Sequence, residues 1–189
     1  MKRIIPGTTL KLNEQARYAA FSVISPVFEA TGGLTLSQLS KLTGLEGTTI
    51  QNWIKRGWVS SSKGKRYSEK QILRILLINM LRGAMRLEDV VNLMKYINGD
   101  VEDDSDDIIE EELLYNILCR IIFTAEEEGA FESETVKRLI SREINSYSRE
   151  FTSGVDKLHK AMYVMVMGYR SGCLKAEMDE TLSEILNEI

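Results

Sequence analysis

The chain of 189 residues is poor in the residues on which many catalytic and secreted proteins depend, with two cysteines, two prolines and one histidine. One histidine and no glycine-rich phosphate loop leave no plausible nucleophile and base, so we expect no enzyme, no cofactor and no metal. Two distant cysteines, Cys119 and Cys173, do not suggest a secreted disulfide framework. The sequence also lacks a long apolar run and a signal peptide, which predicts a cytoplasmic protein without a membrane partner.

Strand-like alternation is nearly absent, and the 43% hydrophobic content is sufficient for a core, so the sequence predicts an all-α fold. Ser68 and Gln71 form a capping box, while Gly44 and Gly57 suit helix ends. Residues 58–67 predict a short hairpin or extended loop. The expected helices span residues 13–30 with a kink at Pro26 or a second piece capped by Ser25, then 36–43, 47–56, 69–83, 87–97, 107–126, 133–149, 154–171 and 176–188.

Charge divides the chain near residue 98. Residues 1–98 hold 15 Lys and Arg against 6 Asp and Glu, a balance of +9, whereas the remainder has a balance of −13. A reversal of this size favours two modules with different partners, and the basic module is the candidate for nucleic acid. We therefore predict a basic domain over 1–98, an acidic linker over 99–106 and an acidic four-helix domain over 107–189.

Helices 36–43 and 47–56, joined by a tight turn, predict a helix-turn-helix whose second helix enters the major groove. Ile50, Trp53 and Ile54 form the stripe that should be buried. The opposite face offers Gln51 and Asn52, whose amides suit adenine, and nearby basic side chains suit phosphates. The residues that we expect to contact DNA are Thr48, Gln51, Asn52, Lys55, Arg56, Lys63, Lys65, Arg66 and Tyr67. We expect Tyr67 to pack beneath the basic loop of residues 63–67, with its hydroxyl directed to a phosphate.

Several short motifs resemble the MerR-type winged helix-turn-helix DNA-binding domain. They are Leu-Thr-Leu-Ser-Gln-Leu-Ser-Lys-Leu-Thr-Gly-Leu over 34–45, Thr49-Ile50, Gly57, Arg66-Tyr67-Ser68-Glu69 and Leu87-Glu88-Asp89-Val90. The order of elements, including Lys-Arg-Tyr-Ser and an acidic stretch before a helical C-terminal half, is most similar to a bacterial MerR-like family classed as a domain of unknown function. The resemblance implies a winged helix with a small hairpin wing and a role in transcription. It departs from the MerR pattern at Glu46, where Ser or Thr is usual, and such an anion suits DNA only if it points away to cap the helix.

Three weaker signals favour ordinary structural roles. The run of acids over 100–107 has Ser105 where a calcium loop needs glycine, so a solvated linker is the better interpretation. His159 with the two cysteines lacks a close ligand pair, and packed core residues are expected instead. Met162, Met165 and Met167 are interpreted as core rather than as the lining of a ligand pocket.

We predict a sequence-specific DNA-binding protein, most simply a bacterial transcriptional regulator. Regulators of this kind usually read two half-sites, so we expect a homodimer through the C-terminal domain, with helix 154–171 as the first choice of interface. Two alternatives stay open: a protein-interaction adaptor whose helix-turn-helix does not meet DNA, and an excisionase-like architectural factor. A small-molecule effector is unsupported by any motif. The charge division also suggests that the acidic half folds back and competes with DNA.

Overall fold

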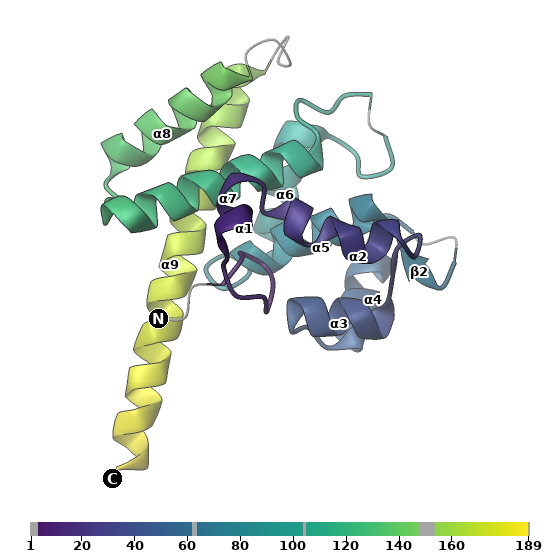
Figure 1. Cartoon of the computed structure of the whole chain (residues 1–189), viewed down its shortest axis with the longest axis horizontal. Coiled ribbons are helices and arrows are strands. Elements are labelled where there is room, and N and C mark those ends of the chain that lie inside the picture. Colours follow the sequence, from purple (N-terminus) through teal and green to yellow (C-terminus); the bar gives the residue numbers. More distant parts are fainter. Residues whose placement is uncertain (1–3, 62–63, 104, 148–153, 189) are drawn as a thin grey trace.

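The computed structural model describes residues 4–61, 64–103, 105–147 and 154–188, and it is mostly helical with one two-stranded antiparallel sheet (Figure 1). The elements are α1 (Glu14–Tyr18), the 3-10 helix η1 (Phe21–Val23), α2 (Ser25–Glu29), β1 (Leu34–Thr35), α3 (Leu36–Thr43), α4 (Gly47–Lys55), β2 (Arg66–Tyr67), α5 (Glu69–Leu81), α6 (Leu87–Asn98), α7 (Glu111–Glu128), α8 (Ser133–Ser146) and α9 (Val155–Asn187). The predicted helical class is therefore confirmed. In the described part of the chain, no helix has the length and apolar character needed to span a membrane.

Helix α5 is the central element of the fold. Ser68 and Gln71 form the predicted capping box, with each side chain bonded to the other residue's backbone N–H. The apolar residues that follow surround the helix, and nearly every side chain from Gln71 to Leu81 is buried. Because α5 is apolar all round, it packs against α3, α6, α7 and α9 rather than facing solvent.

The N-terminal helix is shorter and more broken than predicted. Asn13 caps α1 as expected, its side chain accepting a hydrogen bond from the backbone N–H of Ala16. The single kinked helix over 13–30 is wrong, because α1, η1 and α2 are three separate pieces. Pro26 lies in the first turn of α2, but Ile24 rather than Ser25 occupies the N-cap position.

The short sheet joins segments that are far apart in the sequence. Tyr67 pairs with Leu34 and Arg66 with Thr35, so β2 lies against the strand that precedes α3. Of the two forms expected over 58–67, the hairpin is wrong for the described residues, since 58–61 contain no strand and belong to a loop. Gly33 makes this pairing possible, because at its φ of +113° a Cβ atom would lie 2.4 Å from the carbonyl oxygen of Tyr67.

Helix α9 is continuous where the sequence predicts a break at Ser171-Gly172. Gly172 lies against Gly83 inside the continuous helix, and a Cβ atom there would be at an ordinary contact distance of 3.4 Å from the Gly83 carbonyl carbon, so the glycine marks a packed position rather than a turn. Helix α7 begins at Glu111 rather than 107 and ends at Gly129 in the left-handed conformation. Asn98 holds the intervening loop, because its buried amide both donates to and accepts from the backbone of Ile109.

The two halves that the charge pattern separates share one hydrophobic core, which runs through α5, α7 and α9. The apolar side of residues 154–171, which the sequence suggested first as the dimer interface, is part of this core. Its buried side chains are Leu158, Ala161, Met162, Met165, Val166 and Tyr169. That surface is therefore unavailable to a partner, because α9 needs it to pack against α7 and α8.

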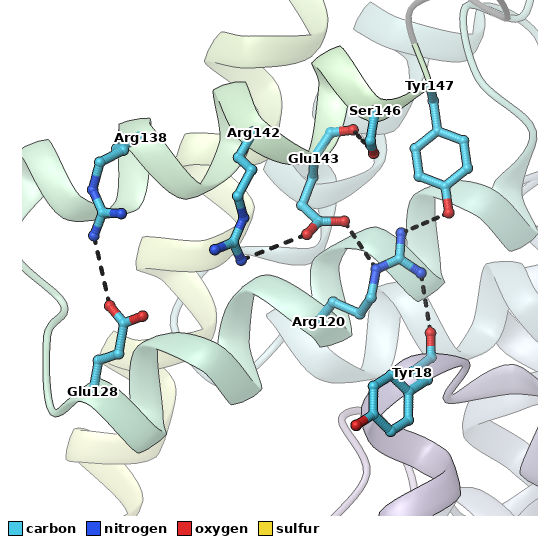
Figure 2. A network of polar contacts seen from close by, with 8 residues as sticks. All are labelled: Tyr18, Arg120, Glu128, Arg138, Arg142, Glu143, Ser146 and Tyr147. Atoms are coloured by element: carbon cyan, nitrogen blue, oxygen red, sulfur yellow. Dashed lines mark hydrogen bonds and ion pairs between the residues drawn. The ribbon is translucent and has the colours of Figure 1, made fainter.

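A polar network centred on Arg120 ties the N-terminal segment to the C-terminal half (Figure 2). The guanidinium of Arg120, on α7, lies 2.9 Å from a carboxylate oxygen of Glu143 on α8 and donates to the hydroxyl of Tyr147 at 3.1 Å. It also donates to the backbone carbonyl of Tyr18 at 3.1 Å, at the end of α1. One cation therefore joins three segments that are distant in the sequence.

Candidate nucleic-acid interface

Helices α3 and α4 are joined by the three-residue turn Gly44-Leu45-Glu46. Thr35 and Gln38 form a capping box at the start of α3, and Gly44 ends it with a φ of +71°. Leu39 of α3 and Ile50 and Trp53 of α4 are buried in the core. The bounds of both helices agree with the predicted 36–43 and 47–56 to within one residue.

Two residues that the sequence did not identify hold the end of α3. The backbone N–H of Thr9 donates to the carbonyl of Leu42 at 2.8 Å, and its hydroxyl donates to the carbonyl of Lys41 at 2.9 Å. The side-chain amide of Asn79, on α5, donates to the carbonyls of Thr43 and Gly7. These bonds satisfy carbonyls that a helix leaves open at its C-terminus. The turn before α4 is therefore braced from two sides.

The chain that leaves α4 is fixed by two further residues of α5. Arg74 donates through Nε to the carbonyl of Trp58 at 3.3 Å, and Gln71 donates through Nε2 to the carbonyl of Ser60 at 2.8 Å. Both side chains are buried. The sequence signal was available, because an arginine and a glutamine in an otherwise apolar helix must find polar partners. Helix α4 is thus anchored at both ends to the central helix.

Helix α4 presents one polar face to solvent, as its spacing predicts. Thr48, Gln51, Asn52 and Lys55 are exposed. Ile50 and Trp53 are buried on the opposite side, and Ile54 is half-buried against the core.

The basic residues beside α4 differ in the contacts that they make. Lys65 is exposed. Arg56 forms an exposed ion pair with Glu88 at 3.5 Å and lies over the ring of Trp58. Arg66 donates to the carbonyl of Gly33 at 2.9 Å, which holds β2 beside β1.

Two predicted contact residues differ from the others. Tyr67 is only 7% exposed, and burial raises the pKa of its hydroxyl. The burial agrees with the prediction that the ring packs inward, but a side chain so deeply buried supports the fold rather than offering a surface to a phosphate. Lys63 lies outside the described residues.

Acidic side chains lie close to the same surface. Glu46 is exposed at the N-cap of α4, and its side chain makes no capping hydrogen bond. Glu102, in the loop between α6 and α7, accepts a hydrogen bond from the backbone N–H of Ser61 at 3.0 Å. Its neighbour Asp103 has a lowered pKa, chiefly because its carboxylate accepts hydrogen bonds from Ser105 and, to a smaller extent, because Lys70 is near. The acidic loop therefore lies beside the basic one.

The described residues contain no group of three or more His, Cys, Asp and Glu side chains that would hold a metal ion. Cys119 is fully buried, and Met162 and Met165 are core residues, as expected, whereas His159, Met167 and Cys173 are only half-buried. Burial raises the pKa of the Cys119 thiol far above its usual range, which suits packing rather than reactivity.

Comparison with known proteins assigns the family. Residues 23–118 match the family described as "Domain of unknown function (DUF1836)", which is just over half of the chain, and the chain belongs to this family. It is 23% identical over 162 residues to "Uncharacterized protein YkrK" of Bacillus subtilis (strain 168), covering 80% of this chain and 69% of that protein. No solved structure matches the chain.

These matches correct the resemblance drawn from the sequence. The matched family is not a known MerR-type domain, and no MerR-type or helix-turn-helix family matches, so the MerR assignment is wrong. The short motifs over 34–90 are the kind that any capped helix pair followed by a polar loop produces, because capping boxes and glycine ends are general. Membership of a family of unknown function is confirmed.

Proposed function

We propose that this member of the DUF1836 family binds double-stranded DNA through α4, with α3 and α4 acting as a helix-turn-helix. The observation that carries the proposal is the exposed polar face of α4. Among the described residues, the side chains of Gln51 and Asn52 make no internal hydrogen bond, although the helix beneath them is anchored at both ends. A rigid helix with uncommitted amides on its outer face suits the major groove.

Each side chain has a separate role in this proposal. Gln51 and Asn52 read base edges, with each bidentate amide contact to adenine contributing about 1–3 kcal/mol of discrimination. Thr48 lies in the first turn of α4, where a helix first meets the bases. Lys55 and Lys65 bind phosphates, which sets the register without reading sequence.

The remaining residues near α4 support the backbone contacts. Arg56 exchanges the carboxylate of Glu88 for a phosphate, and this exchange is inexpensive because exposed ion pairs contribute little to stability. The described part of the basic loop, residues 64–67, lies against the DNA backbone in the manner of a wing, with Arg66 bonded to Gly33 and Tyr67 buried. Sequence-specific binding of this kind favours a role in transcriptional regulation.

Selection of bound fragments from sheared genomic DNA, followed by sequencing, tests the proposal. The full chain is expected to enrich fragments that share a short motif. A double variant, Gln51→Ala with Asn52→Ala, should lose that enrichment and still bind DNA weakly. The matched control Asn92→Ala, an exposed asparagine on α6, should enrich the same motif. Enrichment no greater than for DNA incubated without protein would contradict the proposal.

A second candidate function is a protein-interaction adaptor that uses the same surface. Glu46 lies at the N-terminus of α4, Glu88 pairs with Arg56 just after the helix, and Glu102 lies beside Ser61, so the surface carries both signs of charge. Mixed charge suits a protein partner better than a uniformly anionic polymer. The two candidates differ in salt dependence, since DNA binding weakens steeply with salt through counterion release.

A further inference from the structure

The last turns of α9, about four from Leu174 to Asn187, extend beyond the body of the protein (Figure 1). Every residue from Leu174 to Glu188 is exposed. In Figure 1 this end of α9 points away from α3 and α4, so it takes no part in the surface proposed for DNA. A helix of this length without tertiary packing is only marginally stable in water, because most helix stability in proteins comes from a buried apolar face. The projecting end therefore lacks the packing partner that its length requires.

Apolar side chains form a stripe along this exposed helix. The exposed members are Val164 at 40%, Leu174 at 49%, Met178 at 57%, Leu182 at 49%, Ile185 at 50% and Leu186 at 61%. The intervals from Val164 through Met167, Ser171, Leu174, Met178 and Thr181 to Ile185 alternate between three and four residues, which is the spacing of a coiled-coil seam. Met167 is half-buried against the core, and Ser171 and Thr181 are polar. The exposed apolar side chains at seam positions of the projecting end are therefore Leu174, Met178 and Ile185.

The stripe excludes most of the acidic residues of the projecting end. At about 100° per residue, Leu174, Met178 and Ile185 lie within roughly 40° of one another around the helix axis. Asp179, Glu180 and Glu184 fall on the other faces, Glu177 lies near the edge of the stripe, and Glu188, at the end of the helix, takes the position that follows Ile185 in the seam. Two copies can therefore bring their apolar stripes together and leave most of the carboxylates in water.

The fully buried side chains that hold α9 to the body face away from the stripe. Leu158, Met162 and Met165 are buried against α7 and α8, and they lie roughly 130–200° around the helix from the middle of the stripe. A partner on the stripe would therefore leave the core contacts of α9 in place.

We propose that the stripe is the seam of a homodimer, in which α9 of one copy packs against α9 of a second copy. The apolar face of a straight helix is complementary to itself, which is the requirement of a two-fold symmetric interface. Lys175 is the one basic residue from Leu174 to Glu188, so the stripe offers little to a phosphate backbone or to an acidic membrane surface. A second copy is the occupant that this chemistry fits.

The size of the seam sets the strength of the dimer. From Val164 to Leu186 the helix is about 33 Å long, and a seam roughly as wide as a helix, about 10 Å, covers an area on the order of 300 Å² per copy. Stable protein complexes bury about 800 Å² of accessible surface per partner. The structure thus points to a concentration-dependent dimer with a dissociation constant in roughly the micromolar range.

Sedimentation velocity on the full chain, at concentrations from roughly 1 to 500 µM, tests this inference without DNA. The wild-type chain should shift from monomer to dimer across the series. Met178→Glu adds a carboxylate to the stripe and should raise the dimer dissociation constant by at least about tenfold, because a charge at a seam position must be desolvated. Ser183→Glu adds the same charge to an exposed position off the stripe and serves as the matched control.

The two dissociation constants can be compared directly, because both substituted side chains are exposed and far from the core. Circular dichroism should give both variants the fold of the wild type. A wild-type chain that stays monomeric at the highest concentration would overturn the proposal, as would equal dissociation constants for Met178→Glu and Ser183→Glu. Since no step uses DNA, failure of the dimer proposal is separate from failure of the proposed function.

Discussion

Arg74 of α5 and Glu111 of α7 form an ion pair of 2.7 Å, with side chains only 3% and 6% exposed. The pair joins the basic half of the chain to the acidic half. The same guanidinium donates through Nε to the carbonyl of Trp58, three residues after α4 ends. Glu111 therefore fixes the side chain that positions the end of α4, and packing in the acidic half is connected to the proposed DNA surface.

Removing one partner of this ion pair should destabilise the protein strongly. Glu111→Leu leaves the Arg74 guanidinium buried beside an apolar group, and we expect the free energy of unfolding to fall by about 3–5 kcal/mol. Chemical denaturation followed by circular dichroism measures the loss. Glu110→Gln, at the exposed neighbouring position, should change stability by less than about 0.5 kcal/mol.

The double variant Arg74→Met with Glu111→Leu measures the net contribution of the ion pair to stability. Replacing both charges with apolar side chains removes the desolvation penalty, so most of the lost stability should return. A double variant as unstable as Glu111→Leu alone would show that loss of the hydrogen bond from Arg74 to Trp58 costs as much stability as removal of the unpaired charge restores.

Local signals explain which elements could be predicted from the sequence. The capping box at Ser68 and the glycine at position 44 specify helix ends through neighbouring residues, and the structure has both. The stripe of Ile50 and Trp53 likewise predicts which side of α4 is buried. The exposed amides followed from the same spacing, so one face of the candidate site was predictable.

Features that depend on distant segments could not be predicted in this way. The pairing of Arg66 with Thr35 joins residues far apart in the sequence, so the local turn pattern at 58–67 suggested a hairpin instead. Gly172 resembled a helix break because its packing against Gly83 cannot be read from its neighbours. The anchoring role of Asn79 was missed for the same reason.

Glu46 should weaken DNA binding, because its exposed carboxylate lies at the N-terminus of α4 without capping it. Glu46→Ser removes the charge and supplies a preferred N-cap side chain. We expect affinity for a DNA duplex at low salt to rise about 3- to 10-fold and stability to rise by about 0.5–1 kcal/mol. Fluorescence anisotropy and chemical denaturation measure the two effects.

Glu46→Gln distinguishes charge from capping, since it removes the carboxylate without adding a hydroxyl cap. Its DNA affinity should rise as in Glu46→Ser, while its stability should not. If neither variant binds DNA more tightly at low salt, Glu46 does not lie near the phosphates and the proposed orientation of α4 is incorrect.

Because α9 is continuous at Gly172, substituting this glycine with alanine should raise stability, whereas a helix break there would make the same substitution lower it. Gly172→Ala should stabilise the protein by about 0.5–1 kcal/mol, because alanine favours helix and its Cβ would meet Gly83 at ordinary contact distance. Gly129→Ala, at a φ of +63°, should destabilise it by a similar amount. Thermal unfolding compares the two. A turn at Gly172 would instead make both substitutions destabilising.

The acidic loop should compete with DNA for the basic loop. Glu102→Gln keeps an oxygen to accept from the backbone N–H of Ser61 but removes the charge, and Asp103→Asn removes a second charge near Lys70. The double variant is expected to bind DNA a few-fold more tightly at low salt, with the difference shrinking as salt is added. Charge neutralisation is preferable to deletion of residues 100–189, because that deletion would expose the core around α5. Equal affinities at low salt would count against competition.

Anisotropy titration of a selected duplex and an unrelated duplex, at several salt concentrations, tests whether α4 reads DNA. If Lys55, Arg56, Lys65 and Arg66 each neutralise one phosphate, log affinity should fall with log salt at a slope of about −3 to −4. Lys65→Ala should reduce that slope by about 1 on both duplexes. Gln51→Ala with Asn52→Ala should lower the preference for the selected duplex and leave the slope unchanged. An affinity that does not depend on salt, or a preference for the selected duplex that survives the double substitution, would show that α4 does not read DNA in this way.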